Sequence, residues 1–110
     1  MPRYIDTAID WLSRASESGD DRAQVALATT YIDGQHIEPD YEKALPLLTR
    51  SSNAGNVEAS FALGYLSETG LGVPVNIDRA FSHYKKAATA GHVPAQLWMG
   101  RWFSDGAGAD

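Results

Sequence analysis

Residues 55–91 decide the fold of this chain, and they read GNVEASFALGYLSETGLGVPVNIDRAFSHYKKAATAG. This stretch contains one copy of a 36-residue unit, residues 56–91, which continues in register on both sides without an insertion. The residues repeated identically across three copies are Gly19, Gly55 and Gly91; Gly34, Gly70 and Gly106; Ala23, Ala59 and Ala95; and Ala8, Ala44 and Ala80. A fixed period of this length is typical of a solenoid, in which each unit buries its apolar face by stacking on its neighbours.

The composition describes one folded, acidic domain. The chain has 110 residues, of which 44% are hydrophobic and 21% are charged, so a disordered chain is not expected. Its 14 acidic and 9 basic side chains give a net charge of −5, which would repel a phosphate backbone and argues against a nucleic-acid partner. The absence of cysteine excludes disulfides, thiolate zinc sites and cysteine nucleophiles.

No apolar segment approaches the length of a membrane span, so we expect no membrane insertion. The N-terminal residues also lack the apolar core of a signal peptide. These two observations lead us to expect a soluble chain in the cytoplasm, although a signal peptide that had already been removed would leave no trace here.

Apolar residues at spacings of three and four predict six helices of similar length. Five of them are expected at 4–18, 21–33, 41–54, 57–69 and 77–90, and the sixth has Pro94 in its first turn and ends near Ser104. Glycine stops a helix because it adopts the left-handed conformation without steric cost. The residues at the expected N-caps are Asp20, Asp40, Asn56, Asn76 and His92.

The predicted fold class is therefore an all-α solenoid of antiparallel helix pairs. We expect a single domain over residues 1–110, with full repeats at 20–55 and 56–91 and half repeats at 1–19 and 92–110. Pro46 is the one irregular feature, because a proline past the first turn crowds the carbonyl of Glu42 at a cost of about 3 kcal/mol. A bend is expected there and not in the related helices.

The repeated residues resemble the tetratricopeptide pattern, in which the first helix carries aromatic-x-x-Leu-Gly-x-x-Tyr and the second Ala-x-x-x-Phe. The corresponding residues are Gln24, Leu27, Ala28 and Tyr31; Ser60, Leu63, Gly64 and Ser67; Gln96, Met99, Gly100 and Phe103; and, on the second helices, Ala8 with Leu12, Ala44 with Leu48, and Ala80 with Tyr84. The 36-residue period, the longer loop from Gly70 and the ending YKKAATAGH resemble the SEL-one-like repeat (SLR) family. Local departures are Ala28, Ser67, Pro46 and Leu47.

The resemblance implies a binding scaffold whose repeats are not catalytic. We expect no enzyme activity, no cofactor and no metal site. No two histidines share a helix at spacing four, and His83 aligns with Trp11 and Leu47, as a packing or groove residue would. The paired glycines lack the lysine and third glycine of a phosphate loop, and the acidic pairs lie at helix starts. We expect Tyr31, Tyr84 and Phe103 to lie in the core.

In tetratricopeptide-like stacks, the outward face of the first helix of each pair (the first-type helix) lines the concave groove, so this face is the predicted protein-binding groove. Its candidate residues are Arg22, Val25, Thr29, Asp33, Phe61, Tyr65, Glu68, Leu97 and Arg101, with Ile32, Glu58, Thr69, Pro94, Ser104 and Asp105 at matching positions. Val25, Phe61 and Leu97 could equally pack against the adjacent repeat. Tyr65 and Arg101 are favoured as anchors, because aromatic and guanidinium groups are common at interface hot spots. The expected partner is a protein or peptide.

An alternative function is structural, with the chain stacking head to tail. The first helix of the chain corresponds to the second helix of a pair (a second-type helix) and has no first-type helix before it. The last is a first-type helix with no second-type helix after it, and it carries more large apolar side chains than the other first-type helices. The candidate end-to-end contact residues are Ile5, Ile9, Leu12, Trp98, Met99, Trp102 and Phe103. Contacts of this heterologous kind propagate unless a ring closes. A capped monomer and a fragment of a longer array remain the other interpretations.

Overall fold

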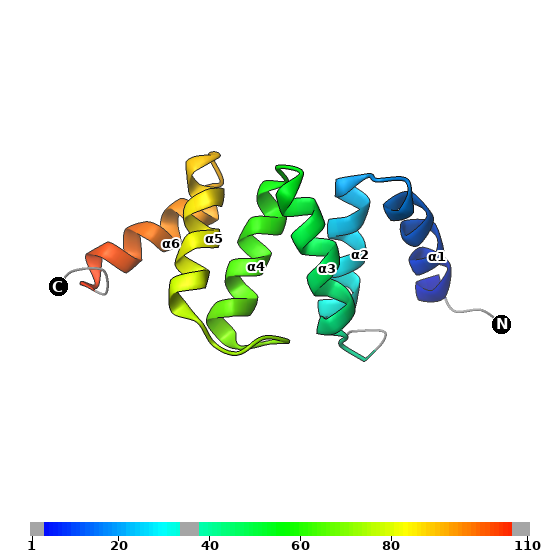
Figure 1. Cartoon of the computed structure of the whole chain (residues 1–110), viewed down its shortest axis with the longest axis horizontal. Coiled ribbons are helices and arrows are strands. Elements are labelled where there is room, and N and C mark those ends of the chain that lie inside the picture. Colours follow the sequence, from blue (N-terminus) through cyan, green and yellow to red (C-terminus); the bar gives the residue numbers. More distant parts are fainter. Residues whose placement is uncertain (1–3, 34–37, 107–110) are drawn as a thin grey trace. The chain divides into compact units, whose positions relative to one another are not determined.

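A computed structural model describes residues 4–33 and 38–106, and the described residues form six α-helices (Figure 1). They are α1 (Tyr4–Glu17), α2 (Asp21–Asp33), α3 (Tyr41–Asn53), α4 (Val57–Thr69), α5 (Ile77–Thr89) and α6 (Val93–Ser104). For α1 to α5, whose two ends were both predicted, the observed ends lie within one residue of the predicted ones. His36 and the side chain of Ile5 lie outside the described residues.

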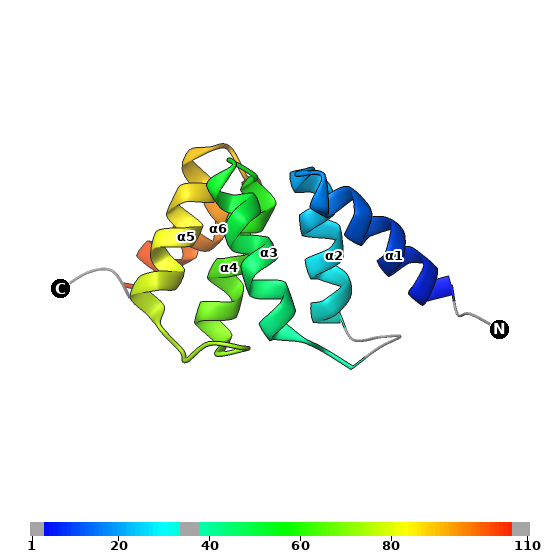
Figure 2. The same cartoon turned by 45° about the vertical axis from the view of Figure 1, so that its right-hand side comes forward.

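The helices divide into two compact units, residues 1–59 and residues 60–110, and the division falls inside α4. In the first unit α2 lies between α1 and α3 and runs antiparallel to both (Figures 1 and 2). In the second unit α5 packs on α6, and it also packs on α4, where the Tyr84 ring lies against Gly64. Each unit is therefore built from antiparallel neighbours in the chain, as the sequence predicts.

Three helix ends share one backbone motif, spaced 36 residues apart. Gly19, Gly55 and Gly91 have φ values of 90°, 96° and 97°, which only glycine adopts at little cost. The residue after each glycine donates its N–H to the carbonyl five positions back, over 3.3, 3.0 and 3.1 Å respectively. This is the Schellman arrangement, and it satisfies carbonyls that the helix leaves without partners. The predicted role of these glycines is confirmed.

The predicted N-caps are also confirmed. Each cap side chain accepts a hydrogen bond from the backbone N–H three residues later, and these pairs are Asp20 with Ala23 (3.3 Å), Asp40 with Lys43 (3.1 Å), Asn56 with Ala59 (3.0 Å), Asn76 with Arg79 (2.9 Å) and His92 with Ala95 (3.3 Å). The backbone N–H groups of Ala23 and Arg22 lower the pKa of the Asp20 carboxyl, because they stabilise its charged form. Every cap after α1 thus comes from the residue type that the sequence indicated.

Pro46 lies inside α3, which continues as one α-helix from Tyr41 to Asn53. The proline therefore does not end the helix. The expected bend near Glu42 stays a prediction.

The core consists mainly of small and branched residues on the repeated stripes. The alanines Ala59, Ala95, Ala44 and Ala80 are all fully buried, and so are Leu48, Leu66 and Tyr84 to within one per cent. Two of the predicted core aromatics differ from Tyr84. Tyr31 is only half-buried, and Phe103 is 56% exposed, so the core assignment of Phe103 is wrong. The Phe103 ring still contacts Phe81 of α5, with the ring centroids 6.1 Å apart.

Among the described helices, none combines the length and the apolar character needed to cross a membrane.

Candidate functional site

The first unit has a shallow depression of about 350 Å³ at the start of α2 and α4. Its lining residues are Arg22, Val25, Asn56, Val57 and Glu58. Arg22 is largely exposed and forms an ion pair of 3.5 Å with the Asp20 carboxylate. Two of the predicted groove residues, Arg22 and Val25, therefore share one hollow, whereas Thr29 and Asp33 lie exposed further along α2.

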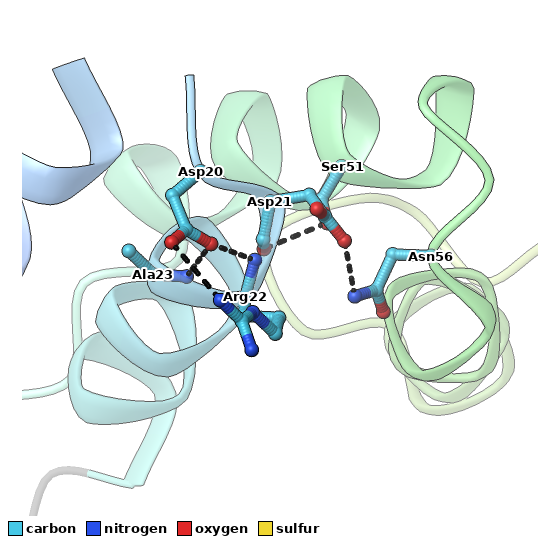
Figure 3. Close-up of polar contacts among 6 residues, drawn as sticks. All are labelled: Asp20, Asp21, Arg22, Ala23, Ser51 and Asn56. Atoms are coloured by element: carbon cyan, nitrogen blue, oxygen red, sulfur yellow. Dashed lines mark hydrogen bonds and ion pairs between the residues drawn. The ribbon is translucent and has the colours of Figure 1, made fainter. Parts of the chain in front are cut away.

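Asn56, which lines this depression, belongs to a polar network with Asp21 and Ser51 (Figure 3). The hydroxyl of Ser51, which is fully buried, donates to the backbone carbonyl of Asp21 over 3.0 Å. The Asn56 side-chain amide donates to the Asp21 carboxylate over 2.8 Å, while its oxygen caps α4. Asp21 thus ties the start of α2 to the end of α3 and the following junction. The sequence indicated only that acidic pairs lie at helix starts, and it did not reveal this network.

Glu68 is the centre of polar contacts in the second unit. Its Oε1 accepts a hydrogen bond from the Tyr84 hydroxyl at 2.9 Å, and its Oε2 accepts one from the Trp98 indole N–H at 3.1 Å. Burial and the hydrogen bond to the Glu68 carboxylate together raise the pKa of Tyr84 far above its usual range. One carboxylate from α4 therefore positions one aromatic side chain on α5 and one on α6.

Aromatic rings continue from Glu68 across α5 and α6. The Tyr84 and Trp98 ring centroids are 4.2 Å apart, and Trp98 stacks on Trp102 at 5.2 Å with an interplanar angle of 21°. Phe81 contacts this row, with its centroid 5.7 Å from that of Trp102 and 6.1 Å from that of Phe103. These separations are typical of favourable aromatic pairs. Both tryptophans are half-buried, so this row forms a partly accessible aromatic wall.

A second depression of about 310 Å³ opens beside this wall. Its lining residues are Glu68, Trp98, Arg101, Trp102 and Asp105, and we call it the Glu68 pocket. Two large apolar side chains near these lining residues in the sequence are exposed, Tyr65 at 47% and Leu97 at 58%. Tyr65 is one helical turn before Glu68, and Leu97 is one turn before Arg101, so each shares a helix face with a pocket residue.

The structure therefore groups the predicted groove residues unevenly. Glu68 and Arg101 line one pocket with Tyr65 and Leu97 on neighbouring positions, whereas the Phe61 ring packs on Tyr84 (5.1 Å) and on His92 (4.8 Å). The packing alternative applies to Phe61, which is half-buried. One continuous groove through all nine candidate residues stays a prediction.

Neither His83 nor His92 lines the Glu68 pocket. In the described ranges no three histidine, cysteine or carboxylate side chains converge as metal ligands. His92 accepts the capping bond of α6, and His83 is half-buried on α5. Burial, aided by the positive charges of Lys86 and Arg79, lowers the pKa of the His83 imidazole. The pocket chemistry that the chain does provide is aromatic stacking with fixed charges at the edge.

The repeat is that of a known family. The model of the Sel1 repeat matches residues 3–20, 21–56, 57–92 and 93–110. The chain belongs to the Sel1 repeat family. Among curated proteins, none matches it.

Three solved structures show the same fold. A protective antigen present in uropathogenic Escherichia coli strains, which displays an SLR fold, is 32% identical with a TM-score of 0.83 over 89% of this chain. A Sel1 repeat protein from Oxalobacter formigenes is 33% identical over 86% of this chain (TM-score 0.75), and the cysteine-rich protein B of Helicobacter pylori is 25% identical over 79% (TM-score 0.72). These likenesses confirm the predicted fold class, an all-α SLR solenoid of antiparallel helix pairs.

This chain corresponds to only part of the first of these relatives. It spans 21% of the length of the E. coli protein, 71% of the O. formigenes protein and 65% of the H. pylori protein.

Proposed function

We propose that this Sel1-repeat chain is a non-catalytic scaffold that binds a protein or peptide, and that the Glu68 pocket is an anchoring site for that partner. The observation that carries the proposal is the exposure of Tyr65 and Leu97 beside a pocket walled by two stacked tryptophans. Large apolar side chains clustered on a polar-rimmed surface are typical of interaction sites. Sel1 repeats generally serve in protein interactions, which agrees with this assignment.

The pocket has the composition of an interface hot spot. Tryptophan, tyrosine and arginine dominate binding energy at protein interfaces. Here Trp98 and Arg101 line one pocket with Glu68, and Tyr65 is exposed one helical turn before Glu68. Phe81 packs on both tryptophans and Glu68 accepts a hydrogen bond from Trp98. Ordering these side chains on binding should therefore cost little free energy. The net charge of −5 makes a nucleic acid an unfavourable partner.

The proposal can be tested with peptides selected on the intact chain from a displayed random library. Dissociation constants of the selected peptides are then measured by fluorescence anisotropy for the wild type, Tyr65→Ala and Arg101→Ala. Loss of an anchor should weaken binding by roughly 5- to 30-fold, or about 1–2 kcal/mol. Lys85→Ala, an exposed change on α5, is the matched control and should leave binding unchanged.

Melting temperatures of the same variants complete this test. Because Tyr65 and Arg101 are exposed, either change should leave the unfolding transition close to that of the wild type. A lower melting temperature with unchanged peptide affinity would show that these residues support the fold, and the proposed anchor role would then be abandoned.

A further inference from the structure

On α6, Met99, Gly100 and Phe103 form a surface that we call the α6 face, and it is less buried than the equivalent surfaces of α2 and α4. Leu27 and Leu63 are 5% and 7% exposed, whereas the aligned Met99 is half-buried. Ala28 is fully buried and Gly64 is buried, whereas the aligned Gly100 is exposed. Ser67 is 4% exposed, but Phe103 at the same repeat position is 56% exposed. At these three repeat positions α6 is therefore more exposed than α2 and α4.

The helix α1 lacks burial at the complementary positions. Ala44 and Ala80 are fully buried, whereas the aligned Ala8 is exposed. Leu48 and Tyr84 are 0% and 1% exposed, and the aligned Leu12 is only half-buried. The residues that a second-type helix normally buries thus remain accessible on α1.

In the second unit, the equivalent positions of α4 and α5 contact each other. A Cβ built on Gly64 would lie 2.8 Å from the Tyr84 ring, so the second-type helix sits directly on the glycine. At Gly100 the same construction meets nothing within 4 Å. The α6 face and the α1 face are consequently the two halves of one kind of interface, and each half is open in the described part of the chain.

We propose that the α6 face binds α1 of a second copy of this chain. In this arrangement Leu12 of one copy lies on Gly100 of the other, because Leu12 holds the repeat position of Leu48 and Tyr84. A leucine fits at this place, since the first repeat combines a buried leucine with the larger Ala28. Met99 and Phe103 provide apolar surface that the contact would remove from water.

The contact is heterologous, because the two copies use different faces. Each bound copy therefore still offers one free α1 face and one free α6 face, and association continues unless a ring closes. The proposal is independent of the Glu68 pocket. It uses Met99, Gly100 and Phe103 and gives no role to Trp98, whose ring packs between Tyr84 and Trp102.

The test measures molar mass by light scattering coupled to size-exclusion chromatography over a wide range of loading concentrations. The wild-type mass should rise with concentration. Ala8→Glu and Gly100→Glu each place a charge in one half of the interface, and a charge buried without a partner opposes association. Both sites are exposed, so the helical content by circular dichroism should not change. Each variant alone should run as a monomer.

A mixture of the two variants distinguishes this contact from other modes of association. Ala8→Glu keeps a native α6 face and Gly100→Glu keeps a native α1 face, so an equimolar mixture should form a dimer and nothing larger. The control Val93→Glu changes an exposed apolar residue at the start of α6, outside the two faces, and should associate like the wild type.

Three results would overturn the proposal. A wild-type chain that stays monomeric at every concentration would show that another molecule, or nothing, covers the α6 face. Association that survives either glutamate would show that other surfaces are responsible. A variant mixture that remains monomeric would show that the two faces do not bind each other.

Discussion

The first repeat, α2 with α3, and the second repeat, α4 with α5, carry different side chains at two aligned buried positions. The first repeat has Ala28 and Leu48, both fully buried, at the two positions where the second has Gly64 and Tyr84. A ring in place of an isobutyl group needs the space that a missing Cβ provides. The difference shows that the two positions exchange volume, and that the family pattern describes the pair and not each residue separately.

The repeats also differ in polarity near the start of their first helices. Ser51 is fully buried and donates to the Asp21 carbonyl, whereas the aligned Ala87 has no polar group and is equally buried. Asn56 donates to the Asp21 carboxylate, whereas the aligned His92 places its ring 4.8 Å from that of Phe61. The first repeat is thus joined by hydrogen bonds at a place where the second uses apolar and aromatic contacts.

The largest effect is expected from truncating the aromatic member of the second pair. Tyr84→Ala should lower the free energy of unfolding by about 3–5 kcal/mol, because it leaves a cavity on Gly64 and removes the ring that Trp98 packs on. Leu48→Ala in the first repeat should cost about 2–5 kcal/mol. Denaturant unfolding measures both changes.

Tyr84→Phe is the control for that comparison. It keeps the ring and removes only the hydrogen bond to Glu68, so the cost should be about 1 kcal/mol. If Tyr84→Phe destabilised the chain as much as Tyr84→Ala, the hydrogen bond and not the packing would hold the second repeat.

The next largest change in stability is expected from adding a methyl group at Gly64. Gly64→Ala puts a Cβ at 2.8 Å from the Tyr84 ring, and overpacking of this kind costs about 1–3 kcal/mol. Gly100→Ala is the matched change, and it should stabilise by up to about 1 kcal/mol because open space surrounds it and alanine favours helix.

The double variant Gly64→Ala with Tyr84→Leu rebuilds the pair of the first repeat inside the second. It should be more stable than the sum of the single changes implies, and thermodynamic double-mutant cycles measure that coupling. Strict additivity would contradict the exchange of volume between the two positions.

The sequence predicted the helices and their ends well because those signals are local. The glycine that ends a helix and the acid or amide that caps the next, such as Gly55 and Asn56, act within a few residues of their own position. The repeat period then carried each assignment to the next copy. The same period misplaced Phe103, because the alignment gives a position in the repeat and not the helix that would cover it.

The site was less accessible to prediction because its contacts join different helices. Periodicity placed Glu68 on the outward face, but it could not show that Tyr84 and Trp98 both donate to its carboxylate. Gln24 was missed for a related reason. It replaces an aromatic residue of the pattern yet is 2% exposed, and its amide donates to the Ser16 carbonyl at 3.5 Å. A hydropathy pattern does not report a polar group that finds a backbone partner.

A smaller effect is expected from the polar network of the first repeat. Ser51→Ala removes the hydrogen bond to the Asp21 carbonyl and should cost about 1 kcal/mol. Asn56→Asp keeps the oxygen that caps α4 but turns an amide donor into a carboxylate oxygen 2.8 Å from that of Asp21. Because the two like charges repel, this variant should be less stable than Ser51→Ala at neutral pH. Thermal unfolding of both variants beside the wild type checks the order, and an Asn56→Asp variant as stable as the wild type would argue that the Asp21–Asn56 contact contributes nothing.

The smallest expected effect is a pH dependence of the unfolding free energy that arises from His83 on α5 and has no counterpart at Leu47 on α3. His83 holds the position of Leu47, and its pKa is lowered mainly by burial and further by Lys86 and Arg79. In the unfolded chain a histidine titrates near pH 6.5 and takes up its proton first as the pH falls. The unfolded state then binds more protons than the folded one, so stability is complete above about pH 6.5 and decreases as the pH drops below it. His83→Leu restores the residue of the first repeat and removes this proton uptake. The unfolding free energy of the variant should therefore fall less than that of the wild type between neutral and mildly acidic pH. Denaturant titrations at the two pH values measure the difference, and parallel losses in both proteins would show that folding does not disfavour the protonated form of His83.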